Sequence, residues 1–142
     1  MIQQGQCTVF KQHLLSGLEN FAAGTTYTYK IALYTALADI GPSTLTYTTV
    51  NEVVGTGYTA GGMALTISQV PTSDATNQTA YVSFNNAVWT PASFTARGAL
   101  IYNSTTNAAV AVLDFGSDKT ATNSFTVTFP TATSTTAIIR IA

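Results

Sequence analysis

Charged residues are scarce in this chain. They make up 8% of its 142 residues, against about 25% in ordinary soluble domains, and the formal net charge is −1. A charge this small gives no long-range field that would attract nucleic acid, an anionic membrane surface or a charged substrate. The basic residues are also scattered rather than clustered: Lys11, Lys30, Arg97, Lys119 and Arg140. We therefore expect no nucleic-acid and no membrane partner.

Cysteine and histidine occur once each. Cys7 alone cannot form an intrachain disulfide, and His13 alone cannot supply a histidine-based metal cluster. The six acidic residues are spread along the chain and offer no supported acid–base pair. Asp114 and Asp118 could flank a calcium ion, but calcium sites usually collect more carboxylates. The sequence therefore predicts a protein that is not an enzyme, with no catalytic residue, no cofactor and no metal.

Long apolar runs are also missing. None approaches the length of about 18 residues that a membrane-spanning helix needs. Residues 1–5 have neither the basic start nor the apolar run of a secretory signal. We therefore expect no membrane span and synthesis in a cytoplasm.

Strand-forming residues, in contrast, are abundant, and roughly one residue in five is threonine. The length fits one domain, and eight short β-rich runs are separated by turn-forming residues. This pattern predicts a mainly β fold: an antiparallel β-sandwich or jelly roll of about eight strands with one N-terminal helix. In residues 124–129, Phe125, Val127 and Phe129 alternate with hydroxyl residues and should face the core. The eight runs are residues 27–35, 46–54, 63–69, 80–89, 94–102, 108–115, 124–129 and 137–141.

One helix is expected before the strands, over residues 9–23. Four apolar residues recur there at helical spacing and predict one packing face: Phe10, Leu14, Leu18 and Phe21. Thr8 is the candidate N-cap, and Gly24 is the candidate residue that ends the helix. The apolar face would pack on the β domain or, alternatively, on a partner subunit. We therefore divide the chain into an arm, residues 1–8, and a single domain, residues 9–142.

Residues 94–103 and 108–115 predict a β-hairpin, because a short polar connection joins two apolar, β-rich runs. Arg97 interrupts the first run, and a desolvated arginine needs a carboxylate or carbonyl partner. Asp114 on the second run is the candidate, so we predict a structural ion pair between Arg97 and Asp114. Arg140 interrupts another apolar strand, and it too would need a carboxylate or carbonyl partner if it were desolvated.

Two further patterns have a structural interpretation. The glycines of residues 55–62 match a loose dinucleotide-binding fingerprint, but a strand-like segment follows them where that fingerprint needs a helix. They are better explained by a tight bend or bulge. The aromatic residues Tyr81, Phe84, Trp89 and Tyr102 could form a sugar-stacking platform, but aromatics at strand spacing are more often core.

Several stretches of the chain resemble a family of small virion structural proteins of tailed bacteriophages. They are residues 51–62 (NEVVGTGYTAGG), 94–103 (FTARGALIYN), 109–116 (AVAVLDFG) and 137–142 (AIIRIA), together with the N-terminal helix followed by residues 29–35 (YKIALYT). The resemblance implies no catalytic residues.

The resemblance implies a capsid decoration or cement protein that binds and stabilises the icosahedral shell. Its partners would be the major capsid protein or other virion proteins, it would form homo-oligomers in the assembled particle, and it would be located in the virion after synthesis in the host bacterial cytoplasm. The alternative is a neck, tail or fibre component that contacts other virion proteins or a host receptor. A third alternative, a secreted carbohydrate-binding module or hydrolase, predicts that the free protein binds sugar. Low charge at strand edges also favours edges occupied by partners, with residues 1–8 as the segment that orders on binding.

Overall fold

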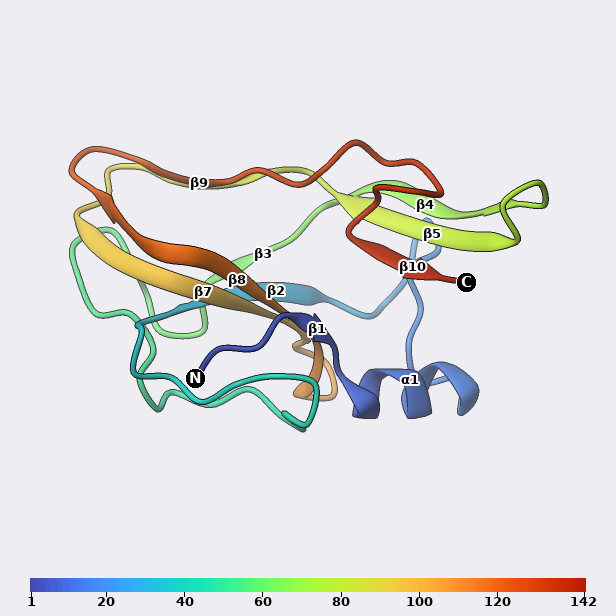
Figure 1. Cartoon of the computed structure of the whole chain (residues 1–142), viewed down its shortest axis with the longest axis horizontal. Coiled ribbons are helices and arrows are strands. Elements are labelled where there is room, and N and C mark those ends of the chain that lie inside the picture. Colours follow the sequence, from blue (N-terminus) through green and yellow to red (C-terminus); the bar gives the residue numbers. More distant parts are fainter.

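The computed structural model describes all residues, 1–142, and contains ten strands and one helix (Figure 1). In chain order they are β1 (Gly5–Gln6), α1 (Thr8–Leu15), β2 (Tyr29–Tyr34), β3 (Met63–Ala64), β4 (Ile67–Asp74), β5 (Thr79–Phe84), β6 (Ala87–Trp89), β7 (Phe94–Asn103), β8 (Ala108–Ala121), β9 (Phe125–Val127) and β10 (Ile139–Ile141).

The strands form three sheets, and every strand pair within them is antiparallel. The largest sheet has the order β1-β8-β7-β2-β3, the second β10-β5-β4, and the third pairs β6 with β9. The predicted fold class is confirmed: the protein is mainly β with one N-terminal helix, consistent with a β-sandwich. The jelly-roll alternative is not confirmed by these strand orders.

The core lies between the largest sheet and the two smaller ones; Figure 1 shows β9, β4 and β5 on one side of β2, β7 and β8. The predicted β7–β8 hairpin crosses the middle of the molecule, and its residues Leu100, Ile101 and Val112 are fully buried. Burying each such side chain contributes about 1.5–3 kcal/mol. Phe125 and Val127 on β9 and the following Phe129 are also buried, as predicted.

The helix is shorter than predicted. It covers Thr8–Leu15 rather than residues 9–23, and Cys7, not Thr8, occupies the N-cap position. Gly17 ends it: with φ of 70°, this glycine adopts a left-handed conformation that a β-carbon disfavours. Two backbone hydrogen bonds of the pattern common at helix C-termini close the end, from Gly17 N to Leu14 O and from Leu18 N to His13 O. The prediction that Gly24 ends the helix was therefore wrong.

The early stop divides the predicted packing face. Phe10 is buried and Leu14 half-buried on the helix, while Phe21 is buried from the loop that follows. The prediction that Leu18 lies on the packing face was wrong. The chain changes direction at Gly17, and Leu18 is 41% exposed.

Residues 1–8 do not form a free arm. Ile2 is buried and bridges Ile40, and β1 pairs with Val112 and Ala111 on β8. Cys7 is fully buried, with its backbone N donating to Val110 O. Apolar burial and strand pairing therefore make this segment part of the largest sheet.

The strand boundaries also differ from those predicted. Residues 46–54 form no strand; they make only isolated bridges, Thr46 to Ala108 and Glu52 to Tyr34. Pro71 and Gly116, although of residue types that favour turns, lie inside β4 and β8 next to register shifts. Proline is tolerated in β4 because β4 is an edge strand. Separately, no helix of the protein has the length and apolar character needed to cross a membrane.

Candidate interaction cleft

A cleft separates α1 and the loop after it from the sheet β10-β5-β4. It consists of two adjoining hollows of about 240 and 370 Å³, which share Leu14 and Ile141 in their walls. Figure 1 shows α1 and β10 at the same end of the molecule. We call this feature the α1–β10 cleft.

The inner hollow is mainly apolar. Phe10, Leu14 and Phe21 form one wall, and Tyr81, Val82 and Ile139 form the other. Its volume of about 240 Å³ exceeds the roughly 150 Å³ that suffices for benzene in an apolar cavity. The inner hollow can therefore accept one large apolar side chain.

The outer hollow combines apolar and basic groups. Leu15, whose exposed fraction is 93%, lies beside Leu14 and Ile141. Lys11 and Arg140, two of the five basic residues of the chain, line the same hollow. No Asp or Glu side chain lines it, although Ala142, the last residue of the chain with its main-chain carboxylate, does. Arg140 is exposed, which explains how it is tolerated in an apolar strand without a carboxylate partner.

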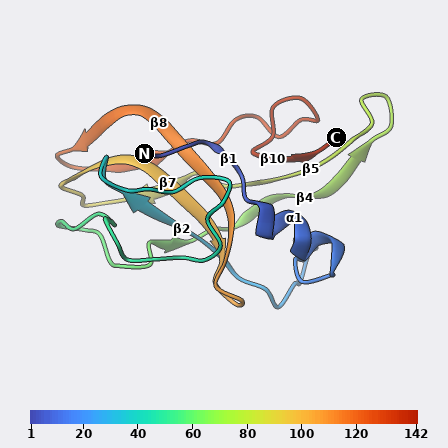
Figure 2. The ribbon, with the colours of Figure 1, turned by 60° about the horizontal axis from the view of Figure 1, so that its bottom comes forward.

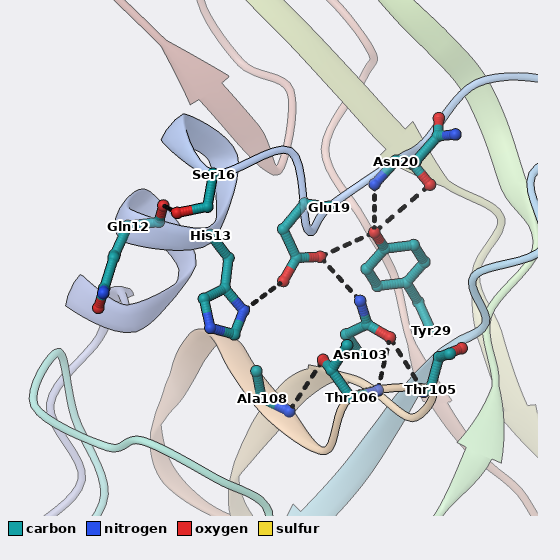
Figure 3. Close-up of polar contacts among 10 residues, drawn as sticks. All are labelled: Gln12, His13, Ser16, Glu19, Asn20, Tyr29, Asn103, Thr105, Thr106 and Ala108. Atoms are coloured by element: carbon teal, nitrogen blue, oxygen red, sulfur yellow. Dashed lines mark hydrogen bonds and ion pairs between the residues drawn. The ribbon is translucent and has the colours of Figure 1, made fainter.

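A buried carboxylate fixes the inner end of the cleft. Glu19 lines the inner hollow, and its side chain has no exposed surface. Figure 3 shows its contacts: Oε2 accepts hydrogen bonds from Tyr29 Oη at 2.8 Å and Asn103 Nδ2 at 3.1 Å, and Oε1 lies 3.6 Å from His13 Nδ1. Burial raises the pKa of the Glu19 carboxyl, and the hydrogen bonds from Tyr29 and Asn103 oppose this shift.

The Glu19 network joins four parts of the chain. His13 comes from the last turn of α1, Tyr29 from β2 and Asn103 from the end of β7. The Asn103 side chain also accepts hydrogen bonds from the backbone N–H groups of Thr105 and Thr106 in the β7–β8 turn. The network therefore holds the helix and its following loop, including cleft residue Phe21, at a fixed position on the sheet (Figure 3).

A second buried carboxylate, Glu52, holds the long segment between β2 and β3. Its oxygens accept hydrogen bonds from Tyr47 Oη at 2.7 Å, Tyr58 Oη at 2.6 Å and Gly61 N at 2.8 Å. Tyr58 Oη in turn accepts a hydrogen bond from Leu33 N on β2. These contacts explain how a segment without strands remains ordered.

The predicted pair of Arg97 and Asp114 forms away from the cleft, on the β7–β8 hairpin. Arg97 Nε lies 3.3 Å from Asp114 Oδ1, and both side chains are about one-third exposed. The pKa of Asp114 is lowered, first by the Gly116 backbone N–H and then by Arg97. The pair is local to the hairpin and contacts no ligand-sized hollow.

The other predicted features are structural in position. Phe84, Trp89 and Tyr102 are buried, so they do not form an open platform. The glycine-rich residues 55–62 make a bend in which Gly57, Gly61 and Gly62 have positive φ, and β3 rather than a helix follows. No three His, Cys, Asp or Glu side chains converge.

Sequence reasoning missed the two buried glutamates and the cleft. The sequence did give one indication: a glutamate within an apolar segment is liable to be buried, and a buried carboxylate needs hydrogen-bond donors around it. The partners could not be inferred, since Asn103 lies 84 residues from Glu19.

The chain was also compared with known proteins. It matches no protein-family model, no curated protein and no solved structure.

Proposed function

We propose that the protein is a virion structural protein of a tailed bacteriophage: a capsid decoration or cement protein that binds the shell of major capsid protein. The resemblance of residues 51–62, 94–103, 109–116 and 137–142 to that family supports the proposal, as do the small β-sandwich-like fold and the low charge.

The observation that carries the proposal is the exposure of large apolar side chains in two regions. Leu15 and Ile141 lie together at the α1–β10 cleft. Leu37 and Val50 lie on neighbouring turns, which a hydrogen bond from Asn51 Nδ2 to Leu37 O connects. Apolar side chains grouped in this way mark protein–protein contact sites. Many copies on a regular shell would add avidity to modest individual contacts.

At the sheet β10-β5-β4, the contacts would be made by side chains rather than by strand addition. β4 is an edge strand, but Pro71 and two register shifts interrupt its edge. At β10, the Arg140 carbonyl already accepts a hydrogen bond from Gln6 Nε2 at 2.8 Å. Both edges are therefore poor templates for a partner strand.

Co-sedimentation with expanded capsids that lack this protein tests the proposal. We expect saturable binding at many copies per shell, and weaker binding of Leu15→Ser, which removes an exposed apolar side chain without disturbing the core. Val88→Ser, on the separate β6–β9 sheet, is the matched control. If the wild-type protein does not sediment with the shells, the cement proposal is wrong. The neck, tail or fibre alternative would then apply if the free protein forms rings or trimers.

A further inference from the structure

The shape and charge of the α1–β10 cleft determine which kind of surface it can bind. Its inner hollow needs a large apolar side chain, and its outer hollow places Lys11 and Arg140 beside exposed Leu15. A complementary surface therefore presents an apolar side chain with a carboxylate close by.

The chain itself has few free carboxylates. Four of its six acidic side chains are already engaged: Glu19 and Glu52 are buried, Asp74 binds Asn77 and Ser134, and Asp114 pairs with Arg97. Asp118 is exposed next to Lys119, which leaves Asp39 as the carboxylate with an exposed apolar neighbour.

Residues 37–39 form a small knob with both features. Leu37 is 79% exposed, and the Asp39 side chain is 96% exposed. Between and after them, Ala38 and Ile40 are buried and anchor the backbone. Asn51 Nδ2 also donates a hydrogen bond to Leu37 O at 3.1 Å. The knob is therefore held in one conformation, which lowers the entropy cost of docking.

We infer that the knob of one copy docks in the α1–β10 cleft of a second copy, with Leu37 entering the apolar hollow and Asp39 lying beside Lys11 and Arg140. The contact cannot form within one copy, because the segment containing the knob lies near the N-terminus, away from α1, in both ribbon views (Figures 1 and 2). The Met1 ammonium lies 3.4 Å from Asp39 Oδ1, but both groups are exposed, and exposed pairs contribute little.

This contact is heterologous, since it joins different surfaces of the two copies. Repetition of such a contact gives a ring if the rotation closes and an open array if it does not. The inference concerns self-association alone, and shell binding tests the proposed function separately; rings that form without shell binding would favour the neck, tail or fibre alternative.

Sedimentation velocity over a concentration series tests the inference on the full chain. We expect the wild-type protein to associate with rising concentration. Leu37→Ser, Asp39→Lys and the double variant Lys11→Glu/Arg140→Glu should each weaken association by about tenfold or more, since each removes apolar or charge complementarity at the contact. All four side chains are exposed, so the variants should keep the wild-type circular dichroism spectrum. Val54→Ser and Asp118→Lys, at exposed positions outside the contact, are matched controls that should associate as wild type does.

Two combinations make the test specific. In an equimolar mixture of Asp39→Lys with Lys11→Glu/Arg140→Glu, the cleft of each variant meets a knob of opposite charge on the other variant, so the mixture should recover association that neither variant shows alone. A chain carrying all three substitutions reverses both charges and should recover association. A wild-type protein that stays monomeric throughout, or association that the knob and cleft variants leave unchanged, would overturn the inference. Equal loss in the control variants would overturn it too.

Discussion

Glu19 Oε1 lies 3.6 Å from His13 Nδ1, inside the protein, at the point where α1 meets the loop that follows it. The contact links the last turn of the helix to a carboxylate that Tyr29 and Asn103 hold from two strands. Helix α1 has only two turns and no side-chain N-cap, so tertiary contacts of this kind must hold it in place.

The first prediction concerns the pH dependence of stability. Burial raises the Glu19 pKa above its ordinary value of 4.5, so the folded protein binds this proton more tightly than the unfolded chain does. The contribution of Glu19 to stability is therefore fully present below about pH 4.5 and declines as pH rises through the raised pKa. Glu19→Gln cannot titrate, so wild type should lose stability relative to this variant as pH increases over that window.

Urea unfolding of both proteins at a series of pH values measures this difference. Asp74 and Asp114, whose pKa values are lowered, contribute in the opposite direction at acid pH, but they are present in both proteins and cancel in the comparison. Parallel stability curves for wild type and Glu19→Gln would contradict the assignment.

The second prediction concerns Glu52, which accepts three hydrogen bonds. Glu52→Ala leaves three donors without their acceptor, and each such loss costs about 1–3 kcal/mol, so we expect destabilisation of about 3 kcal/mol. Limited proteolysis should show new cleavage within residues 35–62, which these bonds hold. Tyr47→Phe removes a single bond and should cost about 1 kcal/mol without new cleavage. Unchanged proteolysis of Glu52→Ala would show that other contacts order the segment.

The third prediction compares two glycines that both have positive φ. A β-carbon at Gly17 would meet no atom within 4 Å, so Gly17→Ala should cost only the backbone preference, about 1 kcal/mol. A β-carbon at Gly62 would overlap the Ile31 carbonyl on β2, so Gly62→Ala should abolish the native fold or displace β3. Thermal unfolding of the two variants measures the contrast. Similar melting temperatures would contradict the described packing of Gly62 on β2.

The fourth prediction tests the docking of residues 1–8. Cys7 is fully buried, and burial raises the pKa of its thiol to about 11. The native protein should therefore react slowly with a thiol reagent at neutral pH and rapidly after unfolding in urea. Rapid labelling of the native protein would mean that the segment detaches, as an arm that becomes ordered only on binding would.

Local patterns predicted a large part of the fold. The β7–β8 hairpin and the inward side chains of residues 125–129 follow from apolar runs, polar turns and two-residue alternation, which depend on neighbouring residues alone. The Arg97–Asp114 pair could be proposed because its residues lie on two strands of one hairpin. The sequence also contained an indication that the helix ends at Gly17, since glycine commonly ends a helix. Leu18 and Phe21 beyond it, at helical spacing, favoured a longer helix instead.

The rest of the structure depends on contacts between distant residues. Tertiary hydrogen bonds to Glu52 override the strand propensity of residues 46–54, and an edge position permits Pro71 in β4. The α1–β10 cleft could not be predicted, because it exists only where α1, β5 and β10, which are distant in the sequence, come together.

The measurement that tests the central claim most directly is the heat resistance of expanded capsids with and without the purified protein. A cement protein joins neighbouring shell subunits, so we predict that the temperature of shell disruption rises as the protein is added and reaches a plateau when its sites are filled. An unchanged disruption temperature at saturating protein would contradict the account.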